Sequence, residues 1–184
     1  MCFFYFDFRD TRKQHRRDLL VSLITQLSTR SDPCCDILCR LYHDYDEGTG
    51  EKPTEDDLIQ CLKEMLTALD QHPVFIIMDA LDECPNSSGI PSPRELVLDL
   101  LKELVDLSSS NLHLCVTSRP EFDIRTALGS LTSHQVSLHD QSGQKKDIIE
   151  YVTSNVRSDA RFHRWRDEDK RVVIDTLSNK AGGM

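Results

Sequence analysis

The sequence contains no apolar run that approaches the roughly 20 residues needed to cross a bilayer as a helix. Its first residues, Met1 to Phe8, are apolar, but they have no basic n-region and are too short for a secretory signal peptide. No internal repeat or low-complexity tract stands out. With 184 residues, 39% of them hydrophobic, the chain is long enough for one α/β domain with a sizeable core. We therefore expect a soluble, cytoplasmic protein.

The sequence also lacks an excess of positive charge. Its formal net charge is −9 and its pI is near 5.2. This balance argues against a polyanionic partner such as DNA, RNA or an anionic membrane. The basic runs at residues 12–17 and 161–171 are interspersed with acids and are typical of solvated helix faces. We expect neither a nucleic-acid nor a membrane partner.

Cysteine is present, but without the spacing of a disulfide framework. Seven irregularly spaced cysteines favour a reducing compartment. Cys35, Cys39 and His43 recur every fourth residue, so they would share one helix face and a zinc site has to be considered. Three ligands on one helix give poor tetrahedral geometry, and a fourth would have to come from elsewhere, such as Cys61. Buried cysteines on a packing face are the default interpretation.

The most informative stretch is an apolar segment that ends in carboxylates. Residues 74–78 predict a strand buried on both faces of a parallel sheet. Asp79, Asp82 and Glu83 follow where the strand should end, and parallel sheets bind their ligands outside these ends. Carboxylates suit hydrated Mg²⁺, so Asp79 could hold the metal or its water. Asp82 or Glu83 could orient an attacking water. The alternative is a core strand that runs into a solvated acidic turn.

A second apolar segment, residues 112–117, ends in a basic residue. Ser118, Arg119 and Pro120 follow it directly. A guanidinium at a strand end suits a terminal phosphate, because arginine is always charged and can bond two oxygens. Pro120 biases Arg119 towards an extended conformation, which helps to direct its side chain. The alternative is a surface arginine paired with a helix acid.

Together, these strand ends resemble the Walker B and sensor 1 strands of the NACHT family of P-loop NTPases. That family has an apolar strand followed by Asp, a small residue, an apolar residue and Asp-Glu, which matches residues 79–83. The Thr-Ser-Arg-Pro of residues 117–120 matches its sensor 1 segment. Residues 5–10, 147–151 and 180–184 are similar to the NACHT domains of fungal NLR-like proteins, often labelled nephrocystin-3-like N-terminal domains. The resemblance spans nearly the whole chain.

The resemblance implies a fold, a set of roles and a set of partners. The fold is α/β, a parallel sheet with flanking helices of the P-loop NTPase (ASCE/STAND) type. The implied roles are metal binding for Asp79, catalysis for Asp82 and Glu83, and cofactor binding for Arg119. Mg²⁺ and ATP are the implied cofactors of the full-length parent. The implied protein partners come from oligomerisation and from neighbouring effector or repeat domains.

One departure from the family is large: the sequence contains no G-x-x-x-x-G-K-[ST] loop. Its glycine pairs, Gly48/Gly50 and Gly182/Gly183, do not precede Lys-Ser or Lys-Thr, so the phosphate cradle is absent. In the family, the Walker A strand lies between the sensor 1 strand and the final strand. We therefore interpret the chain as a fragment that is incomplete at the N-terminus, with Met1 an internal or artificial start. The strand at 112–117 should then have an open, apolar edge.

The rest of the pattern predicts alternating strands and helices in two regions. We expect residues 1–140 to form a partial NACHT core and residues 141–184 a helical extension. Strands are expected at residues 2–8 and, more weakly, around Val136 and Leu138. Helices are expected with an apolar stripe from Leu19 to Leu27 and at residues 34–42, 54–69, 95–107, 121–128, 145–156 and 167–179.

Three functions remain open at this point. The first is an ATP-binding signalling switch whose nucleotide state controls oligomerisation, with ATP hydrolysis undecided. The second is a degenerate interaction module that folds but binds no nucleotide. The third is a metal-dependent hydrolase, which is weakened because His72, His113 and His134 are not at apparent strand ends. The chain alone should not bind ATP with useful affinity, because the glycine loop, its lysine and the helix behind it are absent.

Overall fold

The computed structural model describes residues 1–46, 52–69, 72–87, 89–107, 111–137 and 142–180. The chain forms two compact units, Met1–Thr132 and Ser133–Met184, which are described separately. The expected division between residues 140 and 141 falls outside the described ranges and stays a prediction. Within the described ranges, no helix is both long enough and apolar enough to span a membrane.

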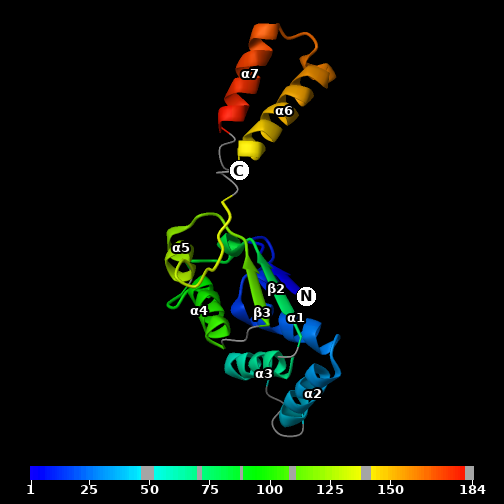
Figure 1. Ribbon diagram of the computed structural model, residues 1–184, viewed down its shortest axis with the longest axis vertical. Helices are drawn as coiled ribbons and strands as arrows, with labels where there is room; N and C mark the ends of the chain where they lie inside the picture. Colours follow the sequence, from blue (N-terminus) through cyan, green and yellow to red (C-terminus); the bar gives the residue numbers. More distant parts are fainter. Residues whose placement is uncertain (47–51, 70–71, 88, 108–110, 138–141, 181–184) are drawn as a thin grey trace. The chain divides into compact units, whose positions relative to one another are not determined.

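Unit 1 is built on a parallel sheet of three strands in the order β1-β2-β3 (Figure 1). β1 (Cys2–Tyr5) pairs with β2 (Val74–Asp79), which also pairs with β3 (Leu112–Val116). The register aligns Tyr5 with Asp79, and Met78 with Val116. All three strands therefore end at the same edge of the sheet. The predicted α/β class and the parallel sheet are confirmed.

Helices follow each strand, as the alternating pattern predicts. Between β1 and β2 lie the short 3₁₀ helix η1 (Thr11–Lys13), α1 (Arg16–Ser28), α2 (Asp32–Asp46) and α3 (Glu55–Ala68). Between β2 and β3 lie the 3₁₀ helix η2 (Leu81–Glu83) and α4 (Pro93–Asp106), and α5 (Phe122–Leu128) follows β3. Both α2 and α4 begin earlier than predicted because Pro33 and Pro93 lie in their first turns, where proline costs no hydrogen bond.

Two helices of unit 1 begin with a reciprocal cap. The Thr54 hydroxyl accepts from the Asp57 backbone N–H while the Asp57 carboxylate accepts from the Thr54 N–H. Ser92 and Glu95 form the same arrangement at the start of α4. These capping boxes satisfy donors that a helix start leaves free. The predicted helix range that starts at residue 54 includes the first cap, whereas the range that starts at residue 95 begins after the second.

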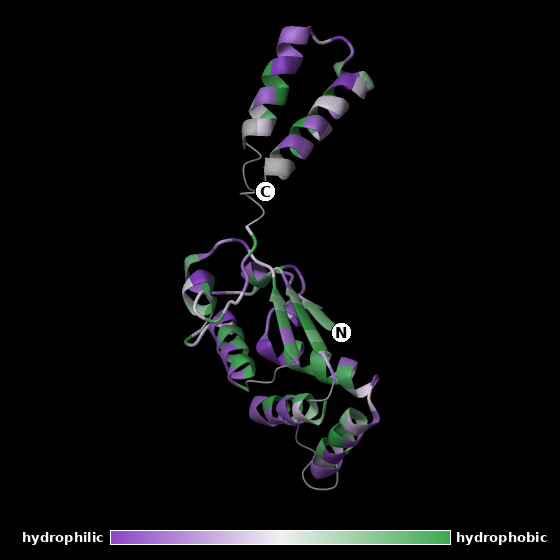
Figure 2. Ribbon diagram, in the orientation of Figure 1, coloured by the Kyte–Doolittle hydropathy of each residue, from purple (hydrophilic) through white to green (hydrophobic). Residues whose placement is uncertain are grey.

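The core of unit 1 lies between one face of the sheet and the helices. The α1 stripe contributes the predicted side chains, all of them buried: Leu19, Leu20, Leu23, Ile24 and Leu27. From the sheet, Phe4, Ile76 and Met78 face the same core, as do the leucines of α3 and α4. The apolar stripes of these helices and the apolar strands are visible in Figure 2. Burial of this continuous apolar surface is what stabilises the unit.

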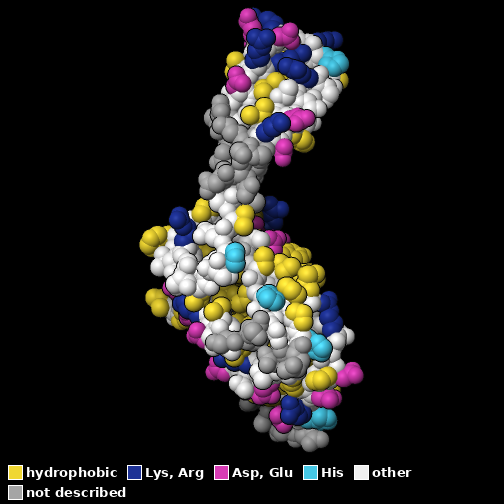
Figure 3. All heavy atoms as spheres, viewed as in Figure 1, with side chains coloured by type: hydrophobic (Ala, Val, Ile, Leu, Met, Phe, Trp, Pro, Cys, Tyr) yellow, Lys and Arg dark blue, Asp and Glu magenta, His cyan; other side chains and the backbone are white. Residues whose placement is uncertain are grey.

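The prediction that β2 is buried on both faces is wrong. Phe75 is 45% exposed, and its neighbours on the same face, Phe3 and Tyr5 of β1, are 53% and 46% exposed. Hydrophobic side chains accordingly gather over the strands at the surface (Figure 3). The cause is the strand order. Because β1, β2 and β3 follow one another in one direction, right-handed crossovers place the helices on one face only.

The two edges of the sheet differ. The side-chain amide of Gln26 on α1 accepts from the Phe3 N–H (3.0 Å) and donates to the Phe3 carbonyl (2.7 Å), so the outward backbone groups of β1 at this residue are satisfied by a side chain. At the other edge, Asn111 and Thr117 bond to β2, so the alternate residues Leu112, Leu114 and Val116 direct their backbone groups outward. No described residue bonds to those outward groups.

The predicted strand around Val136 and Leu138 is wrong for its described part. Residues 134–137 form no strand, and Val136 is exposed. Leu138 lies outside the described residues. A strand at this position needs a neighbour to supply hydrogen bonds, and the described sheet ends at β3.

Unit 2 is a pair of helices, and both were predicted. α6 (Ser142–Ser158) and α7 (Asp167–Lys180) contact each other, and the 3₁₀ helix η4 (Ala160–Phe162) lies between them in the chain. The rings of Phe162 and Trp165 pack edge to face at 5.1 Å in this connection. The family-like ending at residues 181–184 lies outside the described residues.

Candidate functional site

Asp79 and Thr117 join the ends of β2 and β3. Asp79 is the last residue of β2 and is exposed, while Thr117 directly follows β3. The Thr117 hydroxyl donates to Oδ1 of Asp79 and accepts from the Ala80 N–H (3.1 Å). The Thr117 carbonyl accepts from the Leu81 N–H (3.0 Å). One threonine therefore fixes the Asp79 carboxylate and the direction in which the chain leaves β2.

Ala80 turns the chain sharply at this point. Its φ of 56° and ψ of 46° lie in the left-handed region, and no other non-glycine residue in the described ranges has a positive φ. An L-residue pays about 1–2 kcal/mol for this conformation. Strain of this kind often marks functional sites, because the surrounding contacts must hold it. Here the turn places η2, with Asp82 and Glu83, directly beside the strand ends.

Asp82 and Arg119 are brought together from different segments. The backbone N–H of Arg119 donates to Oδ1 of Asp82 (3.0 Å). The Nε atom of the Arg119 side chain lies 3.4 Å from Oδ2 of the same carboxylate. The Asp82 side chain is only 9% exposed, whereas that of Arg119 is 79% exposed. The carboxylate is thus held in place, while most of the guanidinium still meets solvent.

Glu83 points towards the first strand instead. Its Oε2 accepts from the Phe8 backbone N–H (3.2 Å), in the segment after β1. The four predicted site residues therefore lie at the same edge of the sheet, but they do not form one cluster of side chains. Asp82 and Arg119 are in direct contact, Asp79 is fixed by Thr117, and Glu83 is directed towards Phe8.

Sequence reasoning missed two buried residues beneath this edge. Arg94 is 5% exposed and donates to the carbonyls of Asp82 (2.6 Å) and Cys84 (2.9 Å). The Cys84 thiol donates to the Gln14 carbonyl (3.3 Å), and burial raises the pKa of this thiol to about 12. One signal could have revealed Arg94: a cation in the first turn of a helix opposes the helix dipole and so needs other partners.

The donor set fits a particular kind of metal binding. Asp79 offers an exposed carboxylate beside the Thr117 hydroxyl, and hard oxygen ligands of this kind suit Mg²⁺ that keeps most of its waters. The described residues contain no group of three or more His, Cys, Asp or Glu that could hold a metal ion. The site therefore fits a water-mediated ion that also contacts a ligand, but not a cage made of protein atoms alone.

The same finding bears on the zinc alternative at α2. Cys35 and Cys39 are exposed, and with His43 they do not form a metal-binding group within the described ranges. The default interpretation of these two cysteines as buried is also wrong. Helix α2 instead packs through Cys34 and Ile37, which are buried in the core.

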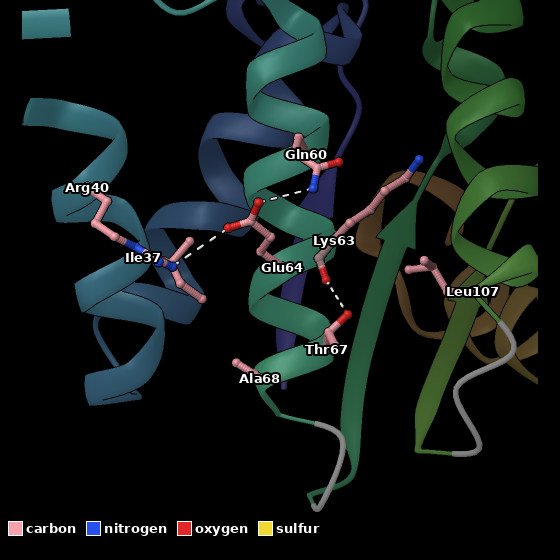
Figure 4. A pocket seen from close by; sticks show the side chains of 8 residues that line it. All are labelled: Ile37, Arg40, Gln60, Lys63, Glu64, Thr67, Ala68 and Leu107. Carbon is pink, nitrogen blue, oxygen red and sulfur yellow. Dashed lines mark hydrogen bonds and ion pairs between the residues drawn. The ribbon is translucent and has the colours of Figure 1, made fainter. Parts of the chain in front are cut away.

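A hollow elsewhere on unit 1 offers no competing site. It lies between α2, α3 and the end of α4, and its lining side chains are drawn in Figure 4. Its charged groups are already paired: Arg40 with Glu64 at 3.7 Å, and Lys63 with Glu103 at 2.7 Å. Surface pairs of this kind contribute little energy and leave no unpaired charge to attract a ligand.

A comparison with protein families gives a match over most of unit 1. The family described as Nephrocystin 3, N-terminal matches residues 1–119 of this chain. The matched range contains all three strands and η2, and it ends at Arg119. No match was found among curated proteins or solved structures. Because residues 1–119 make up more than half of the 184 residues, the chain belongs to the nephrocystin 3 N-terminal family.

Proposed function

We propose that this chain carries the strand-end half of the nucleotide site of a NACHT-type signalling switch, in which nucleotide state controls oligomerisation. The observation that supports this most is the contact between Asp82 and Arg119 across 37 residues of sequence. The two motifs that resemble Walker B and sensor 1 are thereby joined at one sheet edge. Ligands of parallel α/β sheets bind at this edge.

Each residue at the strand ends has a distinct part in this proposal. Asp79, which Thr117 holds in orientation, would hold a Mg²⁺ ion or one of its waters. The exposed guanidinium of Arg119 contacts the terminal phosphate, while Asp82 fixes the Arg119 backbone. Glu83 orients the attacking water if hydrolysis takes place. Mg²⁺ would supply charge neutralisation between the phosphates.

The chain by itself should not bind ATP tightly. One charge-assisted contact contributes about 1.5–3 kcal/mol, against about 8 kcal/mol for micromolar affinity. The sequence has no glycine loop to supply the remainder. Mg²⁺ and ATP therefore belong to the parent protein in this proposal, as do protein partners reached through oligomerisation and through neighbouring effector or repeat domains.

A second candidate function is a degenerate interaction module that binds no nucleotide. It is favoured by one observation: the charged groups at the strand ends are largely satisfied by the protein. Asp82 is paired with Arg119, and Glu83 accepts from Phe8. A site of this kind can persist as a structural element. The metal-dependent hydrolase has no comparable support, since the described residues contain no cluster of three ligands.

Binding of Mn²⁺, a spectroscopic substitute for Mg²⁺, separates the two candidates. The full chain is titrated with Mn²⁺ and followed by electron paramagnetic resonance, alongside Asp79→Asn. The matched control is Asp99→Asn, an exposed acid on α4 that pairs with Lys102. We expect weak Mn²⁺ association that falls about tenfold in Asp79→Asn and is unchanged in Asp99→Asn.

One outcome would contradict this proposal, and another would contradict the expectation that the chain by itself does not bind ATP tightly. If Asp79→Asn and Asp99→Asn bind Mn²⁺ equally well, Asp79 does not face a metal and the degenerate module is favoured. In a parallel titration with a fluorescent ATP analogue, saturable micromolar binding that disappears in Arg119→Ala would show that another segment replaces the glycine loop.

A further inference from the structure

Arg94 is the only buried charged residue in the described part of the chain. Its side chain is 6% exposed, so its charge cannot be solvated and must be met by protein acceptors. The guanidinium offers five N–H donors in a rigid planar fork, which allows one side chain to bond groups on two sides at once.

One side of this fork holds the acidic turn after β2. Nη2 donates to the Asp82 carbonyl at 2.6 Å and Nε donates to the Cys84 carbonyl at 2.9 Å. The Arg94 backbone N–H also donates to the Pro85 carbonyl at 3.1 Å. These short bonds fix the segment that carries Asp82 to the start of α4.

The other side of the fork reaches the start of α5. Nη1 lies 3.2 Å from Oδ2 of Asp123, 3.4 Å from its Oδ1 and 3.5 Å from Oε2 of Glu121. Glu121 follows closely after Arg119, and its N–H donates to the Arg119 carbonyl at 2.8 Å. The contacts to α5 are longer than those to the turn, and their carboxylates are partly exposed.

These contacts close a ring around the strand ends. Arg94 holds the Asp82 carbonyl, the Asp82 carboxylate holds the backbone and side chain of Arg119, and the chain from Arg119 leads to the acids that hold Arg94. We propose that Arg94 is a positioning residue that couples the acidic turn to α5 and thereby sets the place of Arg119. Its relevance to a phosphate rests on the function proposed above, whereas the coupling itself does not.

The coupling depends on chemistry that arginine has and other residues lack. Lysine carries the same charge, but its single ammonium cannot bond the two carbonyls and the α5 carboxylates together. An apolar residue would leave two carbonyls without donors and two carboxylates facing each other without a cation. A substitution or ligand that displaces Asp82 or Arg119 should therefore also displace the start of α5. A substitution in α5 should in turn displace Arg119.

The coupling can be tested by NMR on the full ¹⁵N-labelled chain without metal or nucleotide. Asp123→Ala removes the closest α5 partner of Arg94 without touching Arg119, and Asp99→Ala is the matched control on α4. The readouts are the Nε–Hε signals of Arg94 and Arg119 and the exchange rate of the Arg119 backbone amide. In Asp123→Ala we expect a shifted Arg119 Nε–Hε signal and an Arg119 amide that exchanges about fivefold faster or more. Asp99→Ala should change neither.

Arg94→Lys provides the second test and should change the same Arg119 signals more strongly. If this variant does not fold, Asp123→Ala decides alone. The proposal is overturned if Asp123→Ala shifts the Arg94 signal but leaves Arg119 unchanged, because Arg94 is then a local bridge between α4 and α5. Absence of an ordered Arg119 signal in the unmodified chain also overturns it. Since neither Mn²⁺ nor ATP is present, failure of the metal titration and failure of the coupling are separate results.

Discussion

The two aspartates of the strand-end motif should differ sharply in their contribution to stability. In Asp82→Ala, the largely buried carboxylate that accepts from the Arg119 N–H at 3.0 Å is lost. A hydrogen bond to a charged acceptor contributes about 1.5–3 kcal/mol. The ion pair with the exposed Arg119 side chain adds less than about 1 kcal/mol, because solvent screens it. We expect a loss of about 2–3 kcal/mol in the free energy of unfolding.

Asp79→Ala should cost much less. Asp79 is exposed and accepts from the Thr117 hydroxyl, which can turn to water when the carboxylate is removed. The expected loss is under about 1 kcal/mol. In a domain of this size, 1 kcal/mol corresponds to about 4 °C in melting temperature. Asp82→Ala should therefore melt about 8–12 °C lower than the parent, and Asp79→Ala within about 4 °C of it.

Thermal unfolding followed by far-UV circular dichroism measures both variants, with Asp99→Ala as the surface control. Fluorescence of the single tryptophan is unsuitable, because Trp165 lies in unit 2 and the mutations lie in unit 1. Asp82→Asn keeps an acceptor but loses the charge, so its melting temperature should lie between those of the parent and Asp82→Ala. Equal losses in the Asp79 and Asp82 variants, or a larger loss at Asp79, would refute the assignment of Asp82 as the structural acid.

Three further changes have defined outcomes. Ser92→Ala should lower the free energy of unfolding by about 1–2 kcal/mol in urea titrations, because it removes a buried helix cap; no loss would contradict that role. Asp159 should titrate by NMR near pH 2, because its hydrogen bonds with Arg161 lower its pKa to about 2 from 3.8. The stabilisation is therefore present above pH 3.8 and lost as the pH falls through about 2, and Arg161→Gln should move the midpoint towards 3.8. Iodoacetamide at pH 8 should spare Cys84, whose pKa is raised to about 12 by burial, and early alkylation there would show that the core opens. The exposed thiols should be modified first: Cys35, Cys39 and Cys115.

Local sequence patterns were sufficient to predict the helices, the three strands of the described sheet and the edge at which the candidate site residues lie, but they wrongly predicted a strand around Val136. The apolar stretches before Asp79 and Thr117 form strands, and the leucine stripe of α1 faces the core. Parallel pairing then places the following residues at one edge without any knowledge of long-range contacts. This is why the neighbouring positions of Asp82 and Arg119 could be anticipated from two separate motifs.

Features that depend on contacts far apart in sequence could not be predicted. An apolar strand such as β2 has the same composition whether helices cover one face or two, and only the strand order shows that Phe75 is exposed. Arg94 is a similar case, since its α5 partners Glu121 and Asp123 follow 27 and 29 residues later. For α2, cysteines at adjacent positions point to different sides, and the rotation of the helix decides that Cys34 rather than Cys35 is buried.

The amide of Gln26 blocks one edge of the sheet, so an additional strand can pair only at the other edge. An exposed strand edge pairs readily with another strand, and proteins commonly block such edges. Here a side chain from α1 takes the place of a neighbouring peptide group at Phe3, so an additional strand is obstructed beside β1. The outward groups of Leu112, Leu114 and Val116 have no such obstruction in the described ranges. A strand that joins this sheet would therefore do so beside β3, and its end would lie next to Thr117 and Arg119.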